Sequence, residues 1–346
     1  MLKAKVVLLI VGLMCLYPWI ASAQEVSAGI TGRITDPSGS AIVGATVTAK
    51  NVDRGTDWPT TSNEDGIYTL PRLPIGTYSL KIEAKGFKTS IQPNLPLEIN
   101  QRARLDVTME IGGVTETVTV SGEAALLQTD TTQVGSVISG STIVNTPLVS
   151  RNPLALTLLA PGVTTPNPSG FNTGTRTGGG GRPYVNGNRE EGNNFLLDGV
   201  DNNQTSDNLT AYQPNLDAIA EFKMITNNAS AEFGNFQGGI INVVLKSGTN
   251  QYHGDLFEYF RNDKLNANSW ARNWTVGQNF RSPVRWNQFG GTFGGPIKKD
   301  KLFFFVDYQG LRRATPPSVS ATTLMPAAWR QGDFSNLLDP KYSGVA

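Results

Sequence analysis

The sequence has few of the residues on which catalysis and metal binding usually depend. Its 346 residues include one cysteine, Cys15, and one histidine, His253. A disulfide framework or a thiolate metal site needs more than one cysteine, and a Ser-His-Asp arrangement would have to be built around His253. Neither G-x-S-x-G nor H-E-x-x-H occurs, and Glu190 and Glu191 lie in a predicted loop without an apolar pocket. We predict that the chain is not an enzyme and has no cofactor and no metal.

Charged residues are also scarce, at 16% of the chain with a formal net charge of +1. This balance gives no support to a nucleic-acid partner. The 37 glycines favour turn-rich β structure over long helices. The glycine run Gly178–Gly181 is not a phosphate loop, because no strand precedes it and no Lys-Ser or Lys-Thr follows at the required spacing.

The first 23 residues have the features of a secretory signal peptide. Two lysines precede an apolar core at residues 6–17, which is too short to span a membrane, and Ala21-Ser22-Ala23 supplies a cleavage site. The alternative is a lipoprotein anchored at Cys15, but Met14 stands where such a site needs a small residue. We expect the mature protein to begin at Gln24 and to contain no thiol.

Residues 24–110 alternate apolar and polar side chains in short runs, which predicts a β-sandwich of about a hundred residues. Tight turns are predicted at Asp36–Gly39 and Asn63–Gly66. Trp58, Tyr68 and Tyr78 either stack on a sugar or pack in the core, and the core is favoured for aromatic residues in alternating strands. The predicted strands are Ile30–Thr35, Val43–Lys50, Ile67–Leu70, Gly76–Ile82 and Leu105–Met109.

Residues 111–122 form a predicted linker with a strand-like segment inside it. Ile111-Gly112-Gly113 is a flexible break, and Val114–Ser121 has strong β-propensity. An extended, unpaired strand of this kind can add to the edge of another protein's sheet through its backbone. The alternative is the last strand of the sandwich or the first strand of the next domain.

Residues 123–250 combine asparagines and glycines with short apolar runs, such as 195–197 and 243–245, that predict strands joined by tight turns. A short buried helix is predicted at Leu154–Leu159, capped by Asn152 and Pro153. Asp198, Asp201 and Asp207 do not have the spacing of a calcium loop and are predicted to lie in turns.

Residues 251–346 show the alternation typical of an outer-membrane barrel. Tyr252–Phe260, Val284–Ile297 and Lys301–Gly310 are predicted strands with aromatic residues near their ends. Residues 261–278 are a predicted loop. Phe303 and Phe305 interrupt the alternation of the third strand, so a core strand of a soluble sheet stays open as an alternative.

Several longer motifs resemble the plug domain of TonB-dependent outer-membrane receptors. Asn193–Asp201 resembles the family's N-x-x-L-D-G-V strand and turn, Asp217–Ile225 its helix-to-strand segment, and Ser230–Asn242 its closing glycine-rich segment. The early G-x-I-T-D-P-S-G and D-G-x-Y patterns resemble a carboxypeptidase-regulatory-like domain, which the Oar-like subfamily carries. That domain is similar in shape to starch-binding folds, so carbohydrate binding is implied by analogy of fold alone.

The resemblance implies a mainly β fold class: a seven-stranded-type sandwich, an α+β plug, and the first strands of an outer-membrane β-barrel. It implies plug-gated uptake of an unidentified extracellular substrate, carbohydrate or peptide, in the outer membrane, with the sandwich in the periplasm. The implied partners are outer-membrane lipid and TonB, the periplasmic energy transducer. The TonB-box candidate is Glu116, Thr117, Val118, Thr119 and Val120. The plug-motif candidates are Asp198, Gly199, Val200, Asp201, Gly238, Gly239 and Asn242.

Two further expectations concern the whole protein. A plugged barrel of this class has about 22 strands, whereas residues 251–346 have room for about four strands of roughly ten residues, so we expect an incomplete barrel. The alternative from another functional class is a secreted or surface-attached adhesive β protein with a carbohydrate-binding sandwich.

Overall fold

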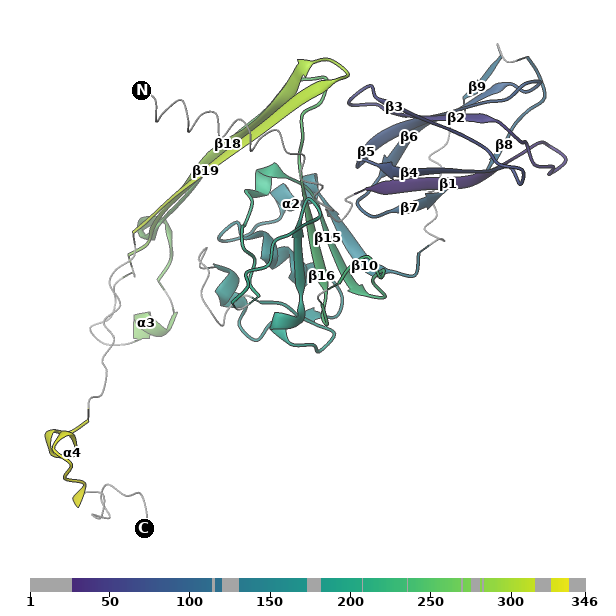
Figure 1. Cartoon of the computed structure of the whole chain (residues 1–346). Helices are drawn as coiled ribbons and strands as arrows, with labels where there is room; N and C mark the ends of the chain where they lie inside the picture. Colours follow the sequence, from purple (N-terminus) through teal and green to yellow (C-terminus); the bar gives the residue numbers. More distant parts are fainter. Residues whose placement is uncertain are drawn as a thin grey trace, which may run out of the picture. The chain divides into compact units, whose positions relative to one another are not determined.

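The computed structural model describes residues 27–113, 116–119, 131–172, 182–206, 208–234, 236–268, 270–274, 281, 283–314 and 325–335 (Figure 1). The predicted signal peptide at residues 1–23, Val120, Gly178–Gly181 and Asp207 lie outside these ranges. Within them, no helix has both the length and the apolar character needed to cross a membrane.

The N-terminal domain is a sandwich of two β-sheets, as predicted. One sheet has the order β4-β1-β7, with β8 also paired to β1, and the other has the order β3-β2-β5-β6-β9. The described residues thus contribute two strands more than the seven expected. The strands are β1 Ala28–Thr35, β2 Thr46–Asn51, β3 Asp57–Thr61, β4 Ile67–Leu73, β5 Gly76–Glu83, β6 Thr89–Leu97, β7 Arg102–Arg104, β8 Val107–Thr108 and β9 Thr117–Thr119.

The core of the sandwich explains the alternation in the sequence. Ala45, Val47 and Ala49 point inward and are fully buried, together with Tyr68 and Tyr78. The two tyrosine hydroxyls donate to the backbone carbonyls of Leu105 (2.8 Å) and Pro74 (2.7 Å). Each ring therefore fills the core with its polar atom satisfied, so neither tyrosine presents a face on which a sugar could stack.

The prediction of an unpaired linker is wrong at Thr117–Thr119. These residues form β9, which pairs in parallel with β6, with Thr117 opposite Thr89 and Thr119 opposite Ile91. Lys88 forms an ion pair with the residue that precedes this strand. Its Nζ lies 3.4 Å from a carboxylate oxygen of Glu116 and 3.3 Å from one of Glu110. Pairing with β6 satisfies backbone groups that a free strand would leave to water, and the sandwich therefore reaches beyond residue 110.

The second domain is built on a five-stranded sheet of order β10-β15-β16-β13-β14, flanked by short helices (Figure 1). The predicted helix after Asn152 is the 3-10 helix η1, with Asn152 accepting from the Leu154 amide at 3.0 Å. It is buried on one side only, since Leu159 is exposed. The elements are β10 Val134–Ser139, α2 Gly140–Asn145, η1 Pro153–Leu159, β11 Val163–Thr164, η2 Pro168–Asn172, β12 Tyr184–Val185, η3 Glu190–Gly192, β13 Asn194–Leu197, β14 Val200–Asp201, η4 Leu216–Ala218, β15 Ile219–Asn227 and β16 Ile240–Leu245.

The two faces of this sheet differ in chemistry. One face packs Phe222, Met224 and Ile241 into a core with η1 and α2. Alternation along β15 places Glu221 and Lys223 on the opposite face, where Ile225 packs in a smaller apolar cluster. Charged residues thus interrupt a buried sheet face, which the sequence pattern did not reveal.

The last strands follow the predicted ranges closely. The strands β17 (His253–Asn262), β18 (Arg285–Lys298) and β19 (Leu302–Ala314) form a sheet in that order. The predicted loop contains the short helices η5 (Asp263–Leu265) and α3 (Trp270–Trp274), and α4 (Ala327–Arg330) follows β19. The chain divides into two compact units. The first consists of the residues up to Phe257 together with Gly290–Gln309, and the second consists of Glu258–Phe289 together with the residues from Gly310 onward.

The aromatic residues of these strands do not all share one face. On β19, Leu302, Val306 and Tyr308 are more than half exposed on the predicted outward face. On β18, however, Trp286 is buried, and the guanidinium of Arg313 lies 4.9 Å from the centre of its ring. Trp286 and Phe293 therefore lie on opposite faces of β18, since they have opposite parity along the strand.

Candidate functional site

The predicted Asp-Gly turn joins β13 to β14. Asp198 and Gly199 both have positive φ, at 49° and 75°, as a two-residue hairpin turn requires. The Asp198 carboxylate accepts from the Leu245 amide at 2.9 Å, and the Asp198 amide donates to the Val243 carbonyl at 2.9 Å. Asp198 therefore ties the turn to β16. Val200 and Asp201 follow on the exposed strand β14.

A fully buried asparagine organises the glycine-rich segment. Asn193 donates from Nδ2 to the Pro183 carbonyl (2.7 Å) and accepts at Oδ1 from the Gly239 amide (2.9 Å). A Cβ on Gly238 would lie 2.5 Å from the same Oδ1. Gly238 is thus required by its close approach to the Asn193 side chain, whereas a Cβ on Gly239 would meet the side chains of Val185 (3.0 Å) and Met224 (3.2 Å). We did not select Asn193 from the sequence, although it opens the first plug-like motif.

Asn242 lies on the polar face of the sheet. Its Cα is paired with that of Lys223 across β15 and β16, its side chain is buried, and its Oδ1 has no hydrogen-bond partner among the described residues. The structure therefore separates the plug-motif candidates into a turn, a glycine–asparagine contact and this polar strand position.

Two charged residues of β15 bind the turn between β6 and β7. The Lys223 Nζ donates to the carbonyls of Ile99 (2.8 Å) and Asn100 (3.3 Å), and the Glu221 carboxylate accepts from the Ile99 amide (2.7 Å). Burial raises the pKa of Glu221 to about 7 and lowers the pKa of Lys223. The two charged residues inside a predicted strand are the sequence signal for this pair, but nothing in the sequence indicates their partner at Ile99.

A second buried charge pair lies within the plug. The Arg151 guanidinium contacts the Asp217 carboxylate, and both side chains are 5% exposed. The same guanidinium lies 4.9 Å from the centre of the Phe257 ring. The pair joins the residues before η1 to η4, so removing one partner would leave a buried charge without its counter-ion.

The described part of the TonB-box candidate, residues 116–119, lies at the edge of its sheet. The strand β9 lies at the end of its sheet, so β6 is its neighbour on one side and no described strand lies on the other. Its two threonines are exposed and Val118 is half-buried. A partner strand could add at the outer edge of β9, or could replace β6 after β9 is released.

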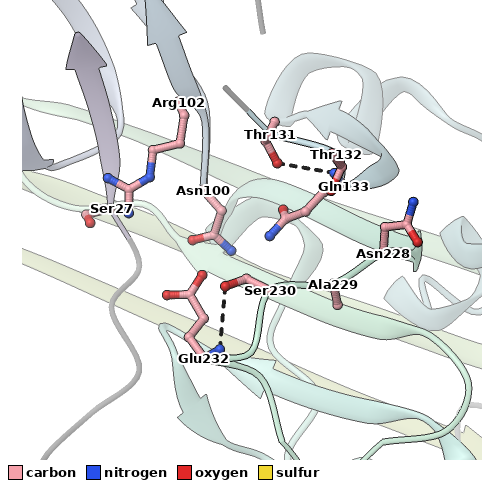
Figure 2. Close-up of a pocket in the computed structure, with 10 residues that line it drawn as sticks. All are labelled: Ser27, Asn100, Arg102, Thr131, Thr132, Gln133, Asn228, Ala229, Ser230 and Glu232. Atoms are coloured by element: carbon pink, nitrogen blue, oxygen red, sulfur yellow. Dashed lines mark hydrogen bonds between the residues drawn. The ribbon is translucent and has the colours of Figure 1, made fainter. Parts of the chain in front are cut away.

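A polar cavity of about 360 Å³ lies beside Asn100 (Figure 2). Figure 2 shows the guanidinium of Arg102 and the carboxylate of Glu232 on different sides of it. None of the described lining residues has an aromatic ring, so they offer no platform on which a sugar could stack. Among the described residues, no group of three or more His, Cys, Asp or Glu side chains could hold a metal ion. The lining residues are Ser27, Asn100, Arg102, Thr131, Thr132, Gln133, Asn228, Ala229, Ser230 and Glu232.

Three known domain families match successive parts of the chain. Residues 29–110 match the carboxypeptidase regulatory-like domain, residues 127–240 match the TonB-dependent receptor plug domain, and residues 244–345 match an outer membrane beta barrel domain. The chain has the domain order of a TonB-dependent receptor. This order confirms the resemblance and the mainly β fold class, and the matched families are those of a transporter and not of an enzyme.

The chain is also similar to individual known proteins. The chain is similar to the TonB-dependent transporter Oar of Myxococcus xanthus, with 27% identity over 318 residues, which is 85% of this chain and 27% of the relative. The chain therefore spans about a quarter of the length of that relative. Among solved structures, it resembles the outer membrane transporter YddB of Escherichia coli (TM-score 0.38, 16% identity, 52% of this chain and 26% of that one). It also resembles the siderophore receptor PirA of Acinetobacter baumannii (TM-score 0.35, 18% identity, 51% and 24%).

Proposed function

We propose that this receptor takes part in TonB-dependent uptake across the outer membrane, with its second domain as the plug of a β-barrel. The observation that carries the proposal is that a plug domain leads directly into long strands. The strands β18 and β19 have 14 and 13 residues, whereas about 9–11 tilted residues suffice to cross a bilayer. On β19 the outward apolar face of Leu302, Val306 and Tyr308 would contact lipid.

The interior of the plug suits an element that has to move within a wet barrel. Its motif residues are joined by hydrogen bonds between asparagine side chains, such as those of Asn193 and Asn203, and nearby backbone groups. Hydrogen bonds of this kind can exchange with water at a modest net free-energy cost, which is typically about 1 kcal/mol each. The apolar core of the plug with η1 and α2 would stay packed while these polar contacts rearrange.

The proposed contact with TonB is the strand β9, with the sandwich in the periplasm. Backbone pairing explains why a short Thr-Val segment suffices, because strand addition uses main-chain groups more than side chains. The transported substrate is proposed only as a carbohydrate or a peptide. The adhesive alternative receives no support from the tyrosines, since both are buried in the sandwich core.

Extraction of membranes from cells that express the protein tests the proposal. We expect the protein to stay in the outer-membrane fraction in high salt and in urea and to enter solution in detergent. We also expect protease to reach the sandwich only after the outer membrane is permeabilised. Release by salt or urea, or cleavage of the sandwich in intact cells, would instead support the adhesive protein.

A further inference from the structure

The turn between β6 and β7 is closed by its own hydrogen bonds. The Gln101 amide donates to the Glu98 carbonyl (3.1 Å), and the Glu98 amide donates back to the Gln101 side chain (2.8 Å). Asn100 has a φ of 52°, and the Gly29 amide donates to the Gln101 carbonyl (2.8 Å), which ties the turn to β1. Ile99 lies within this turn and is fully buried.

The strand β15 of the plug recognises both backbone groups of this one residue. The Ile99 amide donates to the Glu221 carboxylate at 2.7 Å, and the Ile99 carbonyl accepts from the Lys223 ammonium at 2.8 Å. Glu221 and Lys223 are two positions apart and so share a face of the strand. A carboxyl oxygen and the Lys223 Nζ thus match one peptide donor and one peptide acceptor, with hydrogen bonds in opposite directions.

Stability alone does not account for this arrangement. Lys223 is 8% exposed, and taking a charge pair out of water costs free energy that apolar residues at the same positions would not cost. The two bonds are directional and join residues 122 and 124 positions apart in sequence. The pair therefore defines which segment of the sandwich docks on β15 and in which orientation.

We propose that the turn Glu98–Gln101 is a latch that docks the sandwich on the plug through Glu221 and Lys223. The strand β9 pairs with β6, β6 leads into the turn, and the turn is bonded to β15. The latch therefore links β9 to the plug strand β15 through a continuous set of hydrogen bonds. A pull on β9 then acts on the plug sheet through the latch as well as along the chain after residue 119. Only this mechanical consequence rests on the proposed function.

Amide hydrogen exchange at Ile99 in the complete chain tests the latch without TonB. We expect Glu221→Ala and Lys223→Met each to lower protection of the Ile99 amide by about tenfold or more. Protection at Leu80, in the middle of β5, should not change. Glu221→Gln keeps an acceptor oxygen and should retain most of the protection. Glu191→Ala is the matched control, since it removes a plug carboxylate that pairs with Arg182 instead.

Two results would overturn the proposal. One is unchanged protection at Ile99 in Glu221→Ala, or an equal loss in Glu191→Ala. The other is loss of protection at Leu80 together with Ile99 in both Glu221→Ala and Glu221→Gln. That result would mean that the pair is needed for the sandwich to fold and not for the sandwich to dock on the plug. Because no TonB is present, failure of the latch leaves the uptake proposal standing, and failure of uptake leaves the latch standing.

Discussion

Docking of the sandwich on β15 should weaken as the pH rises through neutrality. Burial raises the pKa of Glu221 from 4.5 to about 7, so the docked state favours the protonated acid. A group with a raised pKa contributes stability that is fully present below its unperturbed pKa and is lost as pH rises through the raised value. The window is therefore about pH 4.5 to 7, and docking should be stronger at pH 5 than at pH 8.

The size of the effect follows from the two pKa values. Each pKa unit corresponds to about 1.4 kcal/mol, so linkage from 4.5 to about 7 gives roughly 2.5 kcal/mol between pH 5 and pH 8, on the order of 70-fold in the docking equilibrium. The charged groups around Glu221 are Glu98 from the sandwich and Lys223 on its own strand, with Glu232 acting on Lys223. Burial also lowers the pKa of Lys223, and a lowered pKa makes a contribution that grows as pH rises, opposite in sign to that of Glu221.

The assay is the protection factor of the Ile99 amide at pH 5 and pH 8, because normalising to the intrinsic exchange rate removes the pH dependence of exchange itself. We expect protection to fall by at least tenfold in the parent chain and to stay level in Glu221→Gln, which has no proton to lose. Glu191→Gln should behave like the parent. A level profile in the parent, or the same fall in Glu221→Gln, would refute the reasoning.

Three further predictions follow from the other parts of the structure. Val118→Pro removes an amide from β9 and should abolish binding of the complete chain to the C-terminal domain of TonB in a calorimetric titration, while Thr117→Ser should bind like the parent; retained binding by Val118→Pro would place the box elsewhere. Gly238→Ala puts a Cβ 2.5 Å from Asn193 Oδ1 and should lower the free energy of unfolding of the plug by about 1–3 kcal/mol in urea titrations. Gly234→Ala, where a Cβ meets nothing within 4 Å, is its control and should cost less, and equal losses would contradict the packing argument. A chain of residues 24–119 should melt at a higher temperature than one of residues 24–110, because only the longer one contains β9 and the Lys88–Glu116 ion pair; equal melting temperatures would show that β9 adds nothing to the sandwich.

The sequence by itself determined the order of the three domains and many of their strands, because alternation and turn chemistry are local. Val47 and Ala49 alternate with polar neighbours whatever lies opposite them, and Asp198-Gly199 specifies a tight turn through its own φ preferences. The last three strands were predicted in the same way, because each carries its own alternation.

Only the tertiary structure decided which segments meet. Thr117–Thr119 has the same β-propensity whether it is a free strand or an edge strand. It is an edge strand because hydrogen bonds to β6 satisfy its backbone groups. Glu221 and Lys223 are ordinary charges in the sequence and become a matched pair only when the turn at Ile99, more than 120 residues earlier, is brought against β15. Such contacts depend on burial and on backbone groups that every residue carries, and side-chain patterns along the chain do not record them.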